Sequence, residues 1–264
     1  MREHDHMASP GAPVTIVTGS SRGIGRAIAG ALARDGHRLM LVARGKDDLE
    51  ECVAALQADG ADVASFAADL RHDDAIQAVV KATQDRFGAP DVVVNNAGTA
   101  PSDKVEKTTA DMTQAAFELH VGAPLAFART CAASMKERGS GCLLQLASTA
   151  GLRGYPFTSA YAAAKHGMVG LSRALHAELA PKNMQVYAVC PGFVDSDITR
   201  QAAAAVASKG RSTAAQALEL MGQQNRIGRM HTCEEVAEAV AWLLRERPEG
   251  CVYELDRVPA AFLD

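Results

Sequence analysis

The sequence predicts an α/β fold in which one doubly wound, parallel β-sheet is flanked by helices. Short apolar runs, rich in β-branched residues, alternate along the chain with segments whose apolar residues recur at helical spacing. No internal repeat and no break in composition interrupts this alternation, which therefore predicts a single domain. The 264 residues, of which 48% are hydrophobic, are sufficient to bury one large core.

Seven apolar runs are predicted to be the strands of this sheet, at 14–19, 38–44, 61–70, 90–98, 141–148, 184–192 and 251–256. The segments between them are predicted to contain helices, at 23–36, 46–60, 73–87, 111–138, 159–180 and 232–247. Gly122 and Pro124 are expected to perturb the long fourth helix, because proline lacks the amide proton that a helix interior uses. The alanine-rich stretch 197–226 is expected to be a helical insertion that covers a site.

The N-terminus and the overall charge exclude several classes of partner. Residues 1–12 are polar and lack an apolar signal core, so we expect a flexible leader before the domain at 13–264. The net charge of −4 comes without a basic block, and no apolar run approaches the ~20 residues that span a bilayer. We therefore expect neither a nucleic-acid nor a membrane partner. The six cysteines form no CxxC pair and no zinc-like spacing, so we expect no metal site and a reducing, cytoplasmic location.

A glycine-rich loop, TGSSRGIG (18–25), joins the first predicted strand to the first predicted helix. Its glycines permit a tight turn and close approach of the backbone to a pyrophosphate, and the helix N-terminus adds free N–H groups and a partial positive charge. A position between strand and helix is the context expected of a dinucleotide site. The predicted phosphate-binding residues are Gly19, Ser21, Arg22, Gly23, Ile24 and Gly25.

The end of the second predicted strand indicates which dinucleotide is bound. In dinucleotide folds this position often holds an acidic residue that binds the ribose 2′-hydroxyl. Here the strand ends in LVARG, with Ala43 in place of an acid and Arg44 after it. Two guanidinium groups, from Arg22 and Arg44, suit a 2′-phosphate. We therefore favour NADP(H) over NAD(H); the alternative is that either arginine is simply solvated.

Tyr161 and Lys165, in the stretch YAAAKHG, lie four residues apart in a predicted helix and so share one face. Ser148 ends a predicted strand 13 residues before Tyr161. Together with the TGxxxGxG loop, this set resembles the short-chain dehydrogenase/reductase family, and in particular its 3-oxoacyl-carrier-protein reductases. The resemblance extends over about residues 12–256 through four further motifs, ADL (68–70), NNAG (95–98), PGFVDS (191–196) and GRMHTCEEVAEAVAWLL (228–244).

The resemblance implies a Rossmann-like fold and an oxidoreductase that moves a hydride between NADP(H) and a ketone or secondary alcohol. It implies that Tyr161 is the general acid/base, that Lys165 tunes it and holds the nicotinamide ribose, and that Ser148 holds the substrate oxygen. A free phenol has a pKa of about 10, and a nearby ammonium favours its ionised form, so Lys165 is expected to lower the Tyr161 pKa. The resemblance also implies cofactor contacts at Asp69, Leu70, Asn96, Ala97, Gly98, Pro191, Gly192, Val194 and Ser196.

One position departs from the family pattern. The helix after the fourth strand usually carries an asparagine, which holds a water that links the lysine to solvent. The matching stretch here is ELHVGAPL (118–125), with His120 at that place. We expect His120 to replace the asparagine as a proton relay, since imidazole titrates near neutral pH. Two alternatives stay open: the relay is weakened and the enzyme slow, or His120 is an ordinary helix residue.

The sequence says less about substrate and assembly. The resemblance implies a substrate pocket built from 99–110, 149–160 and 195–226, whose apolar residues indicate a hydrophobic substrate such as a 3-oxoacyl thioester or an alicyclic or aromatic ketone. Arg153 is a candidate contact for an anionic group. The small residues of helix 159–180, with the resemblance, indicate a homotetramer. The alternative functions are an NAD(H)-dependent secondary-alcohol dehydrogenase and a non-catalytic NADP(H)-binding sensor.

Overall fold

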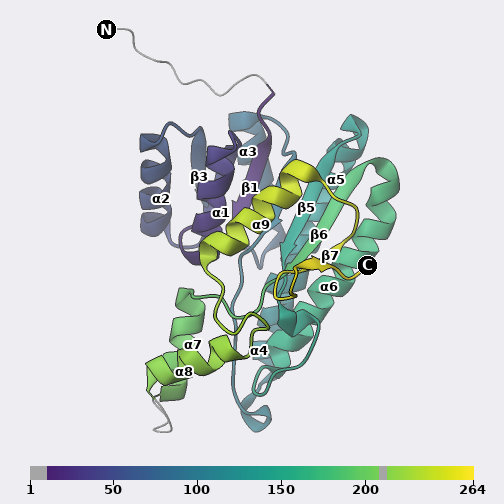
Figure 1. The fold of residues 1–264 in the computed structure, drawn as a ribbon. Coiled ribbons are helices and arrows are strands. Elements are labelled where there is room, and N and C mark those ends of the chain that lie inside the picture. The colour runs from purple at the N-terminus through teal and green to yellow at the C-terminus, as the bar shows by residue number, and fades with distance from the viewer. Residues whose placement is uncertain (1–10, 208–212) are drawn as a thin grey trace.

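A computed structural model describes residues 11–207 and 213–264, which form one eight-stranded sheet with helices on both faces (Figure 1). The strand order is β3-β2-β1-β4-β5-β6-β7-β8. The strands are β1 (Val14–Thr18), β2 (Arg38–Ala43), β3 (Val63–Ala67), β4 (Val92–Asn95), β5 (Gly141–Leu146), β6 (Met184–Cys190), β7 (Val252–Glu254) and β8 (Ala261–Phe262). The chain runs outward from β1 to β3 and then crosses to β4 on the other side of β1, which is the predicted doubly wound topology.

Helices cover both faces of the sheet, and two more, α7 and α8, lie apart from these layers. They are α1 (Gly23–Arg34), α2 (Lys46–Ala58), α3 (Asp73–Phe87), α4 (Ala110–Phe117), α5 (Ala123–Arg138), α6 (Ser159–Leu179), α7 (Asp197–Ala207), α8 (Ala214–Gln223) and α9 (Cys233–Glu246). Strand side chains alternate between two cores: Val17 packs with residues of α1, α2 and α9, and Ile16 packs with residues of α3 and α5. Because both faces are covered, the strands appear in the sequence as continuous apolar runs. No helix in the described part of the chain is long and apolar enough to cross a bilayer.

The long helix expected at 111–138 is interrupted in the middle. Residues Glu118–Gly122 form one π-helical turn between α4 and α5, in which the amide of Ala123 donates to the carbonyl oxygen of Glu118, five residues back. Pro124 has no amide proton for the carbonyl four residues back, so the regular ladder cannot continue here. A wider turn absorbs this gap, as π-turns inside helices commonly do near functional sites.

The insertion expected at 197–226 is helical where it is described. α7 and α8 pack against each other and stand apart from the helices that cover the sheet (Figure 1). The link between them, 208–212, lies outside the described residues. The flexible leader predicted at 1–12 falls almost entirely on residues 1–10, which also lie outside the described residues.

The last strand is a departure from the prediction. β8 pairs antiparallel with β7, with Phe262 opposite Tyr253, so the expectation of a wholly parallel sheet is wrong at this edge. The rings of these two residues meet edge to face at 5.2 Å between their centres. The side chain of Asp264 also accepts the amide of Val252 at 2.9 Å. A two-residue strand is too short for its alternation to be visible in a sequence.

Candidate active site

The predicted site residues gather at the carboxyl ends of the central strands. β1 lies between β2 and β4, so the chain changes direction across the sheet at this point, and open α/β sheets bind ligands in the crevice at such a switch. The loops after β1, β4, β5 and β6 carry, in that order, the glycine loop, the NNAG motif, Ser148 and the PGFVDS motif. The first turns of α6 add Tyr161 and Lys165.

The glycine loop has no room for a side chain at Gly19 or Gly25. Gly19 and Gly23 have φ values of +65° and +53°, which favour glycine. A Cβ on Gly25 would stand 2.1 Å from the carbonyl oxygen of Gly19. Asn96, a predicted cofactor contact, braces this loop from the neighbouring strand, because its Nδ2 donates to the carbonyl oxygens of Thr18 and Gly19 at 2.9 and 3.1 Å. The loop is therefore held in shape before any ligand binds.

The N-terminus of α1 has the donors that a phosphate group requires. Arg22 occupies the N-cap position without capping the helix through its side chain, and the first turn contains no acidic residue. The first amides and the positive end of the helix dipole are therefore unopposed. Arg22 is exposed and lies 3.9 Å from Asp197, and Arg44 forms no ion pair among residues 11–207 and 213–264. This donor set fits the phosphates of a dinucleotide.

Asp69, which follows β3, is already engaged by a neighbour. Arg71 donates to it through Nε at 3.0 Å and pairs with it through Nη2 at 2.5 Å. The hydrogen bonds from Arg71 lower the pKa of Asp69 to about 2, so the carboxylate is ionised but shared. Leu70 beside it is buried. The adenine contact expected of Asp69 stays a prediction, in which the carboxylate would serve two donors.

The loop after β6 connects to both neighbouring loops. The carbonyl oxygen of Pro191 accepts the amide of Thr149 at 2.9 Å, which ties it to the loop that carries Ser148. A Cβ built on Gly23 would meet Cβ of Ser196 at 3.9 Å, so the same loop also approaches the glycine loop. Between these two contacts lie the predicted cofactor residues Gly192 and Val194.

Tyr161, Lys165 and Ser148 lie together at the end of β5. The Lys165 side chain is buried, and its Nζ donates to the carbonyl oxygen of Leu146 at 2.5 Å. Nζ lies 5.8 Å from the centre of the Tyr161 ring. Ser148 Oγ accepts the amide of Ala150 at 3.1 Å, which leaves its own proton free to donate, and it hydrogen-bonds to Tyr161. The four-residue spacing on α6 thus brings Tyr161 to Ser148 and Lys165 to the carbonyl oxygen of Leu146, two residues before Ser148.

Burial decides how Tyr161 and Lys165 ionise. Desolvation raises the pKa of Tyr161 to about 12, and the hydrogen bond from Ser148 opposes this only in part. Desolvation lowers the pKa of Lys165 from 10.5 to about 7. At neutral pH the phenol therefore keeps its proton while the amine is close to half-protonated. The Tyr161 pKa is thus raised and not lowered in this structure, because desolvation outweighs the effects that favour the phenolate; the tuning of Tyr161 by Lys165 stays a prediction.

His120 belongs to the same cluster. It is 1% exposed, and its ring lies nearly perpendicular to that of Tyr161, with the centres 5.7 Å apart. Its Nε2 is 2.8 Å from the carbonyl oxygen of Thr99 and 3.4 Å from the amide nitrogen of the same residue. We assign the proton to Nε2 on the shorter contact, which makes Nδ1 an acceptor. Within the described part of the chain this buried Nδ1 has no hydrogen-bond partner. His120 is therefore not an ordinary helix residue.

The charge state expected of His120 is wrong. Burial, aided by the positive charge of Lys165, lowers the His120 pKa to about 3. The imidazole is consequently neutral throughout the physiological range, and it cannot serve as a group that titrates near pH 7. Its available chemistry is that of a fixed hydrogen-bond acceptor, which an asparagine carbonyl at this place would also provide.

Two residues after β1 and β4 have supporting roles that the sequence analysis missed. Thr18 Oγ1 accepts the amides of both Asn96 and Ala97 at 3.0 Å, which fixes the start of the NNAG loop. Gly98, predicted as a cofactor contact, makes room for His120, since a Cβ there would stand 2.6 Å from Cε1 of the ring. The threonine that begins the TGSSRGIG motif was the available sequence signal for the role of Thr18.

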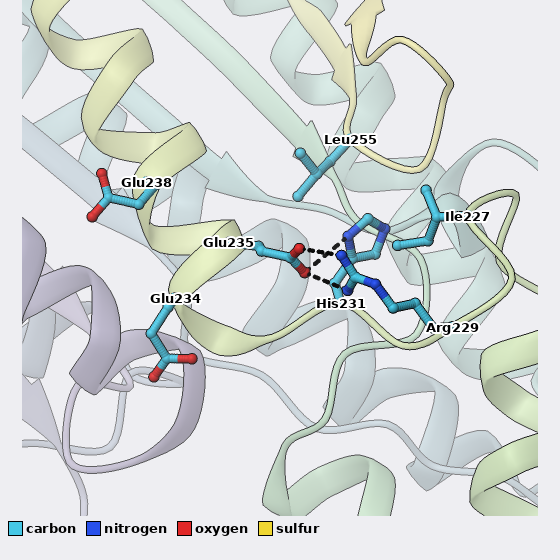
Figure 2. Close-up of a pocket in the computed structure, with 7 residues that line it drawn as sticks. All are labelled: Ile227, Arg229, His231, Glu234, Glu235, Glu238 and Leu255. Carbon is cyan, nitrogen blue, oxygen red and sulfur yellow. Dashed lines mark hydrogen bonds and ion pairs between the residues drawn. The ribbon is translucent and has the colours of Figure 1, made fainter.

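A surface cavity of about 480 Å³ lies elsewhere, beside the start of α9 (Figure 2). Figure 2 shows Arg229 reaching across to Glu235 on α9, with His231 and Leu255 behind them. None of the predicted site residues lines this cavity. It is therefore separate from the cluster around Tyr161.

Known proteins share both the sequence pattern and the fold. Residues 13–207 match the short chain dehydrogenase family. A Streptomyces virginiae protein, assigned by name to the monensin polyketide synthase as ketoacyl reductase, is 34% identical over 232 residues, which cover 87% of this chain and 89% of the relative. The 3-oxoacyl-[acyl-carrier-protein] reductase FabG of Pseudomonas aeruginosa is 31% identical over 230 residues, which cover 87% of this chain and 89% of the relative.

Solved structures of reductases also resemble this chain in fold and in sequence. A variant of the actinorhodin polyketide ketoreductase with NADPH has a TM-score of 0.86 and 32% identity, covering 90% of this chain and 92% of its own. The L-sorbose reductase from Gluconobacter frateurii, complexed with NADPH and L-sorbose, has a TM-score of 0.86 and 29% identity, covering 92% and 94%. The chain therefore belongs to the short-chain dehydrogenase/reductase family of oxidoreductases.

Proposed function

We propose that this oxidoreductase reduces a ketone to a secondary alcohol with NADPH. The observation that carries the proposal is the cluster at the end of β5, where Tyr161 keeps its proton beside Ser148 and Lys165. A carbonyl oxygen that receives a hydride on its carbon needs a donor of this kind at hand. Relatives named as ketoacyl reductases, and a ketoreductase structure with NADPH, support the same reaction class.

In the proposed reaction, the three side chains divide the work on the substrate oxygen. NADPH, when bound, supplies the hydride to the carbonyl carbon. Ser148 donates its free hydroxyl proton in a hydrogen bond to the substrate oxygen, and Tyr161 transfers its own proton as negative charge develops there. A phenol with a pKa of about 12 is still a stronger acid than an alcohol, so the transfer is favourable. Lys165, in its protonated form, stabilises the phenolate that remains.

His120 takes the place of the family's asparagine in this proposal, but not as a titrating base. Its Nδ1 is a buried acceptor close to Tyr161 and Lys165, and its Nε2 proton is committed to the carbonyl oxygen of Thr99. A water or the Lys165 ammonium can donate to Nδ1. His120 would then hold in place the path by which the Tyr161 phenolate regains a proton from Lys165 and Lys165 regains one from water. The imidazole stays neutral throughout.

A substrate panel tests the reaction class. Oxidation of NADPH is followed by the loss of its nicotinamide absorbance, with 3-oxoacyl thioesters, alicyclic ketones and aromatic ketones offered in turn. We expect turnover with at least one apolar ketone and a loss of about 10²–10³-fold in kcat for Ser148→Ala, because an oxyanion donor is removed. Turnover that is undiminished in this variant would contradict the role given to Ser148.

The preference for NADP(H) rests on the two exposed guanidiniums, Arg22 and Arg44, and on Ala43 in place of an acid. We expect Arg44→Ala to weaken NADPH binding by about 10- to 150-fold, since a charge-assisted phosphate contact is worth about 1.5–3 kcal/mol, and to leave NADH binding unchanged. Titration of both dinucleotides by fluorescence measures this. Equal affinities for NADPH and NADH in the unaltered protein would contradict the preference and favour the NAD(H)-dependent alternative.

The substrate is proposed to be apolar. Phe157, before α6, is 62% exposed, and Ile198 and Leu220, on α7 and α8, are 41% and 57% exposed. These residues belong to the segments in which the family resemblance places the substrate pocket. A carbonyl compound with an acyl chain or ring would cover such apolar surface. The same panel measures this, because KM should fall as the ketone becomes larger and less polar.

Assembly and location are also proposals. α6 exposes Ala163, Gly170, Ala174 and Ala177, and such a strip allows a second helix to approach closely, as in a homotetramer. Gly167 of the same helix is already used within the chain, where a Cβ would stand 3.1 Å from Val121 Cγ2. Light scattering after gel filtration measures the assembly. All six cysteines are free thiols, which fits a reducing cytoplasm.

A further inference from the structure

Two buried carboxylates lie just behind the loop that carries Ser148. Asp256 and Glu254, at the end of β7, have side chains that are 0% and 6% exposed. Buried carboxylates require positive partners. The main partner is Arg153, which donates from Nη2 to Asp256 at 3.0 Å and from Nη1 to Glu254 at 3.5 Å. Arg226 is more exposed and lies 3.7 Å from Glu254, while its backbone amide donates to Asp256 at 3.0 Å.

The remaining donor of Arg153 leads to Ser148. Its Nε donates to the hydroxyl of Tyr155 at 2.9 Å. The same hydroxyl forms a hydrogen bond with Thr149 Oγ1, 2.8 Å away. Thr149 follows Ser148 directly, and its amide donates to Pro191 of the loop after β6. A continuous chain of hydrogen bonds therefore joins the buried carboxylates to the residue next to Ser148.

His231 approaches one of the carboxylates from the far side, although its buried Nε2 makes no hydrogen bond within the described part of the chain. His231 lies 3.5 Å from Asp256 through Nε2 and 3.8 Å from Glu235 through Nδ1, at the wall of the cavity in Figure 2. Asn225 holds the backbone of Phe193 on both sides, donating to its carbonyl oxygen and accepting its amide. Hydrogen bonds to Asp256 thus come from two segments that are distant in sequence, through the side chain of Arg153 and the backbone amide of Arg226.

The sequence suggested that Arg153 could contact an anionic group of the substrate. In the structure its Nε, Nη1 and Nη2 already donate to Tyr155, Glu254 and Asp256, so it is not available for that role. We propose that Arg153 is a positioning residue, which fixes Ser148 by clamping residues 149–155 to the buried pair Glu254 and Asp256. The inference rests on the proposed function, since it concerns where Ser148 meets the substrate oxygen.

Two variants distinguish a role of Arg153 in positioning Ser148 from a role in neutralising the two buried carboxylates. Tyr155→Phe removes the link to Thr149 and leaves every ion pair intact. The triple variant Arg153→Gln, Glu254→Gln, Asp256→Asn removes the link together with the buried charges, so that no carboxylate is left unpaired. The matched control is Arg173→Gln. It breaks an ion pair of 2.7 Å between α6 and the C-terminal Asp264, and this ion pair is not part of the network that leads to Ser148.

Each variant is measured for kcat, for NADPH affinity and for amide hydrogen exchange in residues 147–157. We expect Tyr155→Phe and the triple variant to lose about 10- to 100-fold in kcat, the scale of a misplaced catalytic group, with NADPH affinity unchanged within about twofold. Exchange of the Thr149 amide should become faster in both. The control should match the unaltered protein in kcat and in exchange of this segment.

Normal kcat and normal exchange in the triple variant would overturn the inference, because Arg153 would then serve only to neutralise the carboxylates. Normal kcat in Tyr155→Phe would overturn the route through the tyrosine hydroxyl. If the unaltered protein reduces no ketone, the proposed function fails. The exchange measurement still decides, in that case, whether Arg153 orders residues 149–155.

Discussion

Gly25→Ala tests the way in which the glycine loop is built. The new Cβ would stand 2.1 Å from the carbonyl oxygen of Gly19, 2.7 Å from its carbon and 2.5 Å from Nδ2 of Asn96. The first two are backbone atoms, so the loop itself must move by more than 1 Å to reach an ordinary contact of about 3.4 Å. Overpacking of this kind costs about 1–3 kcal/mol, which exceeds the ~0.5–1 kcal/mol that alanine gains over glycine in a helix.

We expect Gly25→Ala to lower the free energy of unfolding by about 1–2 kcal/mol, or about 2–8 °C in Tm for a chain of this size. NADPH affinity should fall by at least about tenfold, because the displaced loop no longer presents its amides. Gly30→Ala, one turn further along α1, is the control. Its Cβ meets only the end of the Arg34 side chain at 3.7 Å, so it should stabilise the helix by about 0.5–1 kcal/mol and leave binding unchanged.

Urea unfolding and fluorescence titration with NADPH measure both effects. If Gly25→Ala were as stable as the unaltered protein and bound NADPH equally well, the close contact with Gly19 would not exist in solution. The assignment of this loop to phosphate binding would then lose its structural basis.

Substitutions at four further residues test the structure. Phe157→Gly should raise the free energy of unfolding by about 1 kcal/mol, because Phe157 has a φ of +66°, in the left-handed region that glycine adopts without strain. Asn183→Gly should raise it by less, because asparagine tolerates the left-handed region. Urea unfolding measures both. Lys165 has a pKa of about 7 in the folded protein and 10.5 as a free side chain, so between pH 7 and 10 the unfolded chain binds more protons and the free energy of unfolding rises with pH. Lys165→Met should reduce this rise by at most about 1.4 kcal/mol per pH unit, which denaturation curves taken across that pH range measure. His120→Ala should lower kcat by about tenfold, and His120→Asn should keep the kcat of the unaltered protein, since only a hydrogen-bond acceptor is required. Neither variant should shift the pH–rate profile between pH 6 and 8. A shifted profile would show that the imidazole titrates in that range.

The architecture was predictable because periodicity is a local property of the sequence. Buried strands such as 141–146 are continuous apolar runs, and α3 was expected at the residues where it occurs, 73–87. The short-range spacing of Tyr161 and Lys165 on one helix likewise fixes their common face. In each case the signal and its consequence lie within a few residues of each other.

The remaining features depend on contacts between distant segments. Nothing in the sequence around Arg153 indicates that it meets two carboxylates about a hundred positions later. The pKa of His120 depends on burial and on Lys165, neither of which is visible in the stretch ELHVGAPL. The π-turn was only half anticipated, because Pro124 announces an interruption but not its form. Long-range burial and charge are what a single sequence does not display.

The central claim is that Tyr161 donates the proton in ketone reduction, and Tyr161→Phe tests it most directly. Turnover is followed by the nicotinamide absorbance with the best ketone of the panel, and NADPH affinity is titrated in parallel. Tyr253→Phe on β7 is the matched control, since it removes a phenol outside the cluster. The account predicts that Tyr161→Phe binds NADPH normally and loses turnover by about 10²–10⁴-fold, while Tyr253→Phe keeps it. Full turnover in Tyr161→Phe, with NADPH bound, would contradict the account.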